Sequence, residues 1–219
     1  MTRMTRRYEI ITFDCYGTLI DWEEGIASAF ARETGLPRES VLRAYAQLEP
    51  AVQRAEYRPY REVLAEAAGR VVRTLAEGAG DRAGAFLAES LPDWKPFPDT
   101  NAALERLRAA GYSLGILSNI DDDLLAATRR HFTVEFDLIV TAQQVRSYKP
   151  AHGHFLAARQ RIGDRHWLHA AQSNFHDIVP ANALDIPSAW VNRLGEEELP
   201  GGTPTFEVRD MAGLANLLA

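Results

Sequence analysis

Residues 10–19 read IITFDCYGTL and contain the first hydrophobic run of the chain, which a carboxylate ends. The first four of these residues form an apolar, β-branched run of the length expected for a buried strand. Asp14 ends the run, and Gly17 and Thr18 follow in a sequence typical of a turn. Open α/β sheets place their chemistry at the carboxyl ends of strands, so Asp14 is a candidate nucleophile. The alternative is that Asp14 only stabilises a turn through its own backbone.

The composition predicts a soluble globular protein. With 219 residues, 46% of them hydrophobic and 25% charged, the chain can bury a sizeable hydrophobic core. Its length favours one large domain or one domain that carries an insertion. No apolar run approaches the length of a membrane span, and the basic residues near the start are not followed by the apolar segment of a signal peptide. We therefore expect a cytoplasmic protein that does not bind a membrane.

The net charge limits the kinds of partner that the protein can bind, and the cysteine content excludes an internal disulfide. The net charge is −6 and the arginines are scattered, which argues against nucleic acid because phosphate binding needs a contiguous basic face. A small molecule is the expected partner. The single cysteine, Cys15, cannot form an internal disulfide and is expected to be a packed thiol. The oligomeric state stays open, and a homodimer is compatible with the sequence.

The chain changes character twice. After residue 21 only helical patterns occur, at about residues 23–34, 39–56, 60–77 and 81–90. A proline-rich segment at residues 92–98 cannot continue a helix and indicates a linker. We therefore expect an all-helical cap over residues 21–96, inserted after the first strand of an α/β catalytic core formed by residues 1–20 and 97–219.

Beyond the linker, helices and strands alternate. A helix capped by Asp99 or Thr100 ends at Gly111. Strands are expected at residues 10–13, 112–117, 138–141, 167–171 and 188–191. Such alternation is typical of a parallel sheet with right-handed crossovers. The predicted fold class is therefore α/β, with a doubly wound, Rossmann-like parallel sheet.

Polar side chains follow several of these strands. In a parallel sheet the carboxyl ends of the strands meet at one edge, so we expect Asp14, Ser118, Lys149 and Asp177 to share one crevice. Each also has a simpler explanation. Ser118 could cap the next helix, Lys149 could be a solvated loop residue, and Asp177 could be the acidic residue favoured at a helix start. Four polar residues in strand order make these explanations weaker.

Four motifs together resemble the haloacid dehalogenase superfamily: DCYGTL at residues 14–19, LSN at 117–119, YKP at 148–150 and SNFHD at 173–177. The similarity covers essentially the whole chain. Within the superfamily the motifs resemble the type II (S)-2-haloacid dehalogenases. This resemblance implies hydrolysis of small 2-haloacids to 2-hydroxy acids through an ester on Asp14, without a cofactor.

The resemblance also implies roles for individual residues. Lys149 would keep the Asp14 carboxylate ionised and correctly turned, and Asp177 would position or deprotonate the hydrolytic water. The carboxylates would be oriented by Thr18, Ser118 and backbone N–H groups near Tyr16 and Asn119. Ser173 and Asn174 match family positions that support the site. The expected substrate-binding residues are Tyr16, Asn119, Arg43, Ser173 and Asn174. Desolvation strengthens a carboxylate nucleophile, so the helical insert would act as a lid.

Some positions depart from the family pattern. The dehalogenases use a cap arginine to receive the halide, and Arg43 lies near that register with Arg54, Arg58 and Arg61 as rivals. A solvated surface role is the alternative for each arginine. Phe155 stands where similar proteins often have tyrosine. His176, beside Asp177, could assist water because histidine titrates near neutrality, or it could be a surface residue.

A Mg²⁺-dependent phosphatase of the same superfamily is the second hypothesis. Its Mg²⁺ would bind Asp14, the backbone carbonyl of Tyr16 and Asp177, with Asp121 or Asp122 as an added ligand. The superfamily phosphatases have a carboxyl group where this chain has Tyr16, and a phenol is a poor proton shuttle near neutrality. They also have an acidic metal ligand where Ser173 stands. Both substitutions disfavour the phosphatase.

A non-catalytic binding member of the fold is the third hypothesis, against which the Asp14 and Lys149 pair argues. The histidine pairs His152 with His154 and His166 with His169 have the spacing of metal ligands. No cysteine or acidic partner completes a set around them, so we interpret them as structural or solvated.

Overall fold

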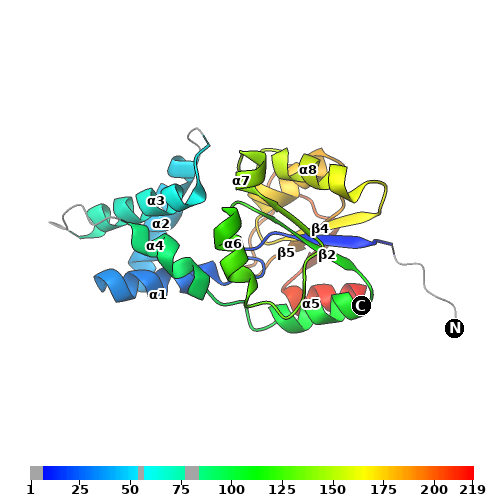
Figure 1. Cartoon of the computed structure of the whole chain (residues 1–219), viewed down its shortest axis with the longest axis horizontal. Coiled ribbons are helices and arrows are strands. Elements are labelled where there is room, and N and C mark those ends of the chain that lie inside the picture. The colour runs from blue at the N-terminus through cyan, green and yellow to red at the C-terminus, as the bar shows by residue number, and fades with distance from the viewer. Residues whose placement is uncertain (1–6, 54–56, 77–83) are drawn as a thin grey trace.

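The computed structural model describes residues 7–53, 57–76 and 84–219. Its centre is a parallel six-stranded sheet with the strand order β3-β2-β1-β4-β5-β6 (Figure 1). The strands are β1 (Ile10–Phe13), β2 (Ser113–Ser118), β3 (Leu138–Thr141), β4 (Trp167–Ala171), β5 (Ser188–Val191) and β6 (Phe206–Val208). The predicted α/β class is confirmed, and the five predicted strands agree with the structure to within one residue at each end.

The first strand lies in the middle of the sheet. All four residues of β1 are buried, as expected for an apolar run covered on both faces. Phe13 is in register with Ile116 of β2 on one side and with Ala170 of β4 on the other. The carboxyl ends of these three strands therefore meet at one edge of the sheet, where Asp14 follows β1.

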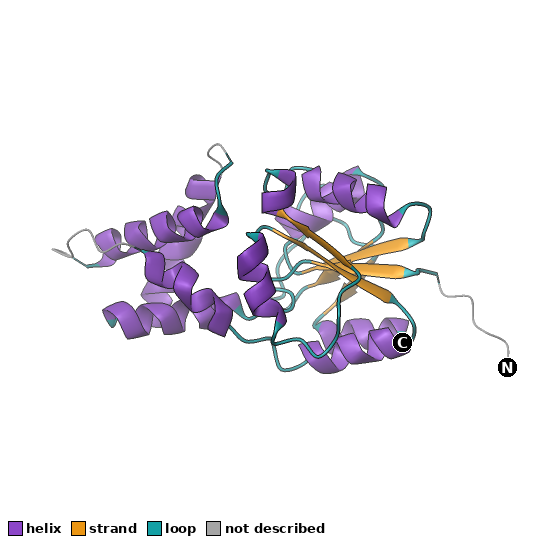
Figure 2. Cartoon of the chain, in the orientation of Figure 1, coloured by secondary structure: helices purple, strands orange, loops and turns teal. Residues whose placement is uncertain are grey.

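Helices cover both faces of the sheet (Figure 2). On one face α5 (Thr100–Ala109) packs against α10 (Met211–Leu218). The opposite face carries α7 (Ala142–Val145) and α8 (Gly153–Ile162). The remaining core helices are α6 (Asp122–Arg129), η2 (Asn174–Ile178) and α9 (Val179–Ala183). No helix in the described ranges has the length and apolarity needed to cross a membrane.

Four helices form a separate group beside the sheet (Figure 1). They are α1 (Trp22–Thr34), α2 (Arg38–Gln53), α3 (Tyr60–Leu75) and α4 (Ala85–Ser90), and the short helix η1 (Leu91–Asp93) follows them. Asp21 starts α1 by accepting a hydrogen bond from the Glu24 amide at 3.0 Å, and Gly35 ends it at a φ of 70°, a conformation that suits glycine. The parts of the helix predictions at residues 54–56, 77 and 81–83 lie outside the described residues.

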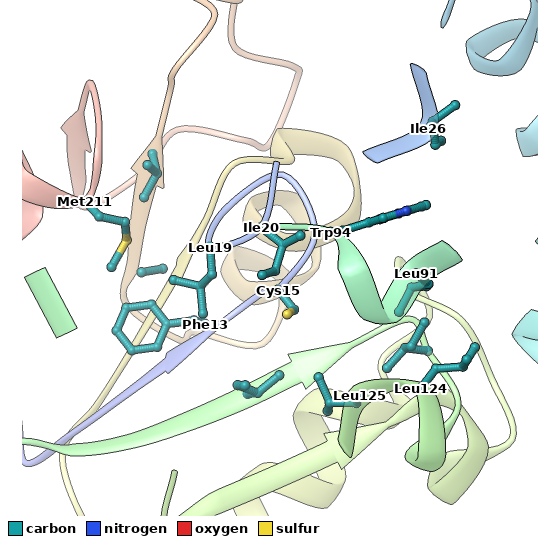
Figure 3. Packing of buried hydrophobic residues seen from close by; sticks show 14 of the residues in the cluster. Phe13, Cys15, Leu19, Ile20, Ile26, Leu91, Trp94, Leu124, Leu125 and Met211 are labelled. Atoms are coloured by element: carbon teal, nitrogen blue, oxygen red, sulfur yellow. The ribbon is translucent and has the colours of Figure 1, made fainter. Parts of the chain in front are cut away.

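A continuous apolar cluster joins the helix group to the sheet (Figure 3). Phe13 of β1, Cys15 just after this strand and Trp94 from the connecting segment belong to it. The Cys15 thiol is buried as predicted. The Trp94 indole N–H donates to the Ser90 hydroxyl at 3.1 Å. Its ring packs edge-on against Tyr16, with the ring centroids 6.0 Å apart. Trp94 thereby fixes the position of the helix group relative to the site.

Gly25 of α1 leaves room for this indole ring. A Cβ atom at Gly25 would lie 2.4 Å from ring atoms of Trp94. We expect Gly25→Ala to lower the free energy of unfolding by about 1–3 kcal/mol, the usual cost of overpacking a core. Thermal unfolding of the two proteins measures this effect. Gly69→Ala in α3 is the matched control, because its nearest obstacle is the flexible end of Arg73 and alanine favours helix. An unchanged melting temperature for Gly25→Ala would contradict the packing argument.

The sequence patterns missed β6. It is only three residues long, it pairs with β5 on one side, and its residues are exposed or half-buried. A short edge strand of this kind lacks the apolar run that identifies the central strands.

Candidate active site

Lys149 lies between two carboxylates at the edge of the sheet. Its Nζ donates to Asp14 Oδ1 at 2.8 Å, to Asp177 Oδ1 at 2.6 Å and to the Leu117 carbonyl oxygen at 2.9 Å. All three hydrogens of the ammonium are therefore used. The side chains of Lys149 and Asp177 are each 1% exposed, and that of Asp14 is 11% exposed. The fold thus holds a buried carboxylate, oriented by a cation, at the end of β1.

Burial and charge oppose each other in this cluster. Burial lowers the pKa of Lys149, but the two carboxylates outweigh it and raise that pKa above its ordinary value. Burial raises the pKa of Asp177, but Lys149 and His169 outweigh it and bring that pKa to about 2. Burial also raises the pKa of Asp14, and the Lys149 ammonium opposes this rise. The lysine therefore favours the ionised, nucleophilic form of Asp14.

His169 of β4 supports Asp177. The indole N–H of Trp167 donates to the Thr12 hydroxyl oxygen at 2.6 Å, and this hydroxyl lies 2.8 Å from His169 Nδ1. The Thr12 hydroxyl can still donate one hydrogen and accept one more, so its role toward Nδ1 depends on the tautomer of His169. His169 Nε2 lies 2.9 Å from Asp177 Oδ1, and a carboxylate oxygen can only accept this hydrogen bond. The histidine therefore donates to Asp177 through Nε2 and fixes its orientation.

Two polar side chains fix the Asp14 carboxylate and the backbone of Lys149. The buried Thr18 hydroxyl donates to Asp14 Oδ2 at 3.2 Å and accepts from the Gln172 amide at 2.9 Å. The Asn119 side chain accepts from the Lys149 amide at 2.7 Å and donates to the Lys149 carbonyl at 3.1 Å. This double hydrogen bond holds the main chain at Lys149 in place, so the ammonium approaches Asp14 from a fixed direction.

A cavity of about 200 Å³ opens over Asp14. Its walls come from the strand ends on one side and from the helix group on the other. The core side contributes Asp14, Tyr16, Ser118, Asn119, Lys149, Gln172, Ser173, His176 and Asp177. The helix group and its connection contribute Trp22, Ile26, Tyr45, Glu49, Gln53, Tyr60, Leu91 and Trp94. The structure therefore brings together the four residues that the sequence placed at strand ends.

Tyr16 is a poor proton shuttle in this cavity. Its hydroxyl lies 2.8 Å from the Thr128 hydroxyl of α6. Burial, with a smaller effect of nearby negative charge, raises the pKa of Tyr16 well above the ordinary value for a phenol. The phenol therefore stays protonated near neutrality and cannot act as a base at the leaving group.

Ser173 and His176 line the cavity together. The Ser173 hydroxyl oxygen accepts from the His176 amide at 3.1 Å and lies 3.1 Å from His176 Nδ1. Ser173 is thus the N-terminal cap of η2, and His176 stands at the cavity wall rather than only at the surface. Phe155 is buried and packs edge-on against His169, with the ring centroids 5.1 Å apart, so it contributes packing where a tyrosine would add a hydroxyl.

The structure does not place Arg43, an expected substrate-binding residue, at the cavity. Arg43 is exposed on α2 and does not line the cavity. Tyr45 of the same helix does line it, and two residues along a helix correspond to about 200° of rotation, so Arg43 faces away. Arg58 instead pairs with Glu66, and Arg61 pairs with Asp123 of α6. The remaining rival, Arg54, lies outside the described residues.

Asn174 also differs from its expected role in substrate binding. Its side chain is buried, donates to the Gly202 carbonyl at 2.9 Å and accepts from the Leu199 amide at 3.2 Å. Both hydrogen bonds join the side-chain amide of Asn174 to backbone groups of the loop before β6. Asn174 therefore supports the site through the backbone, and it is absent from the lining of the described cavity.

The residues proposed for a Mg²⁺ site do not fit this ion. The Lys149 ammonium already bridges Asp14 and Asp177, and a cation between them would have to displace it. Asp121 accepts from the amides of Tyr60 and Arg61 at 2.8 and 2.9 Å and so caps α3. Asp122 accepts from the side chains of Thr141 and Gln144. In the described ranges no three histidine, cysteine or acidic side chains are grouped to hold a metal.

Two residues of the site were not predicted. The sequence leaves His169 as a structural or solvated residue, although a histidine within an apolar, fully buried strand signals a specific polar contact. The sequence motifs do not include Glu49, although Tyr45, Glu49 and Gln53 follow one another at four-residue intervals and so share one face of α2. His154 is structural as expected. Burial lowers its pKa to about 3, so its neutral ring donates through Nε2 to the Ser118 carbonyl at 3.0 Å.

Comparisons with known proteins show the family to which this chain belongs. A model of the haloacid dehalogenase-like hydrolase family matches residues 8–171. Haloacetate dehalogenase H-2 of Moraxella sp. (strain B) is 30% identical over 98% of this chain and 99% of its own length. The (S)-2-haloacid dehalogenase H-109 of Pseudomonas putida is 29% identical over 96% of this chain and 97% of its own length. A solved dehalogenase with an intermediate complex shares the fold at a TM-score of 0.87 and 22% identity, over 99% of both chains. The chain therefore belongs to the haloacid dehalogenase-like hydrolase family.

Proposed function

We propose that this hydrolase releases halide from short (S)-2-haloacids and forms the corresponding 2-hydroxy acids. The main support for the proposal is the arrangement around Asp14. Lys149 Nζ donates to Asp14 Oδ1 at 2.8 Å, and the residue at position 16 of the same cavity is a tyrosine instead of an acidic residue. A halide leaves without needing a proton, whereas the leaving oxygen of a phosphate ester needs an acid. Similarity to the two dehalogenases above supports the same substrate class.

In the first step Asp14 attacks C2 of the haloacid. Because Lys149 binds Oδ1, we assign the attack to Oδ2. A C–O ester bond forms, the C–halogen bond breaks, and the halide leaves with the bonding electron pair on the opposite side of C2. Ser118 and backbone N–H groups near Tyr16 and Asn119 orient the substrate carboxylate. The cavity excludes bulk water, which strengthens the carboxylate as a nucleophile.

In the second step water hydrolyses the ester. Its oxygen adds to the Asp14 carbonyl carbon, and Lys149 stabilises the negative charge that develops on Oδ1. The ester C–O bond then breaks, the hydroxy acid is released, and the net reaction frees one proton. Asp177, whose pKa is about 2, is a weak base, so we assign it mainly to orienting the water. His169 keeps Asp177 in position for this role.

Neither step calls for a cofactor, and we propose that none is used. We also propose that residues 21–96 form a cap over the core of residues 1–20 and 97–219. Packing among α1–α4 and the contribution of these helices to one wall of the cavity support this division. A cap of this kind closes the site against water while the ester exists.

Halide release in the presence of a chelator tests the proposal. We expect the protein to release chloride from (S)-2-chloropropionate at the same rate with and without excess EDTA, because Lys149 supplies the positive charge that a metal would otherwise supply. The (R) enantiomer is the matched control substrate and should react far more slowly. Phosphate esters assayed in parallel address the phosphatase alternative. Phosphate release that EDTA abolishes, without any halide release, would overturn the proposal.

A further inference from the structure

The wall of the cavity contributed by the helix group contains a carboxyl group. Tyr45, Glu49 and Gln53 of α2 and Tyr60 of α3 line this wall. Lys149 is the single lysine or arginine among the described residues that line the cavity, and two carboxylates already hold it. No described arginine therefore faces Glu49 across the cavity.

Glu49 is held by neutral partners. The Gln53 amide donates to Glu49 Oε1 at 3.1 Å. The Tyr60 hydroxyl also hydrogen-bonds the Glu49 carboxyl group, and it contacts the Tyr45 hydroxyl as well. Burial raises the pKa of Glu49 to about 7, and the hydrogen bond from Tyr60 offsets this only in part. Below pH 7 Glu49 is therefore mostly an uncharged acid that can donate a hydrogen bond.

The groups that face Glu49 keep their charge near neutrality. Burial raises the pKa values of Tyr45, Tyr60 and Tyr148, so all three remain phenols. The core wall contributes Asp14, Lys149 and Asp177, whose charges stabilise one another, together with the side chain of His176. Glu49 is thus the group on the helix wall that changes charge near neutral pH.

In the proposed reaction, the direction in which Asp14 displaces the halide places the leaving halide at the helix wall of the cavity. Attack by Asp14 from the strand ends sends the halide to the opposite side of C2, toward the helices. A departing anion needs hydrogen-bond donors, and a second carboxylate there would repel it. On the basis of the proposed function, we propose that the Glu49 carboxyl group, held in place by Gln53 and Tyr60, receives the leaving halide in the place where an arginine was expected.

The pH dependence of halide release tests this site. We expect kcat/KM for (S)-2-chloropropionate to fall about tenfold per pH unit above pH 7, because the ionised form of Glu49 is inactive. Glu49→Gln keeps a neutral donor, so it should stay within a few-fold of the parent at pH 6 and lose the alkaline fall. Glu49→Met removes the donor and should be at least about tenfold slower at pH 6. Glu39→Gln, at an exposed position of α2, is the control and should keep the parent profile.

Bromide binding provides a readout that needs no turnover. Trp22 and Trp94 line the cavity, so bromide bound there should quench their fluorescence in a saturable way. We expect this quenching in the parent at pH 6, its loss at pH 8.5, and its retention at both values in Glu49→Gln. The inference is overturned if kcat/KM of Glu49→Gln still falls above pH 7, or if quenching by bromide has the same pH dependence in Glu49→Gln as in the parent. Neither result contradicts the proposed function. Quenching as expected without any halide release overturns the proposed function alone.

Discussion

Oxygen from water is expected to enter the side chain of Asp14 during a single turnover in H₂¹⁸O. Water attacks the carbonyl carbon of the ester on Asp14, so the label joins the protein carboxylate before any reaches the product. Mass spectrometry of the peptide containing Asp14 measures this incorporation. Label that appears first at C2 of the hydroxy acid would mean that water attacks the substrate directly, and would refute the ester.

Replacement of the same residue gives the largest kinetic effect that we expect. Asp14→Asn preserves the shape of the side chain and removes the nucleophile, so kcat should fall on the order of 10⁴-fold or more, as in other hydrolases that lose a nucleophile. The variant should fold, since Lys149 keeps Asp177 as its partner at 2.6 Å. Asp164→Asn changes an exposed aspartate away from the cavity and should retain full activity. A fall of less than tenfold in Asp14→Asn would assign the nucleophile elsewhere.

Lys149→Met should reduce turnover by at least about a hundredfold, the scale of losing one electrostatic element. The substitution keeps much of the apolar stem but leaves Asp14 and Asp177 without the cation between them. The pKa of Asp14 should then rise further, because burial is no longer opposed by the ammonium. The residual activity should consequently increase with pH as Asp14 ionises, a change that a merely structural role would not produce.

The chain offers a matched control for this experiment. Its other lysine, Lys95, is exposed, and Lys95→Met should match the parent in both rate and pH profile. Circular dichroism and thermal unfolding establish whether Lys149→Met is folded. A folded Lys149→Met protein with near-normal turnover would refute the role assigned to the ammonium.

The sequence predicted the sheet and the edge that carries the site. Apolar runs such as residues 10–13 and 138–141 are local signals, because a strand that is covered on both faces is mostly apolar. The polar residues after them were found in the same way, and the parallel arrangement then implied that Asp14, Lys149 and Asp177 meet. Their distances, and the choice of Leu117 as the third acceptor of the ammonium, follow only from the packed strands.

The wall opposite Asp14 was decided by tertiary structure. Tyr45 and Glu49 lie on the cavity face of α2, whereas Arg43 faces away, because helix rotation is set by packing of α2 against α1 and α3. Distance in sequence from Asp14 carries no information on that rotation. The contact between His169 and Asp177 likewise needs β4 beside β1 and η2 folded over its end. Local patterns thus predicted the strands and the proposed nucleophile, while long-range packing decided which side chains from the helix group line the cavity.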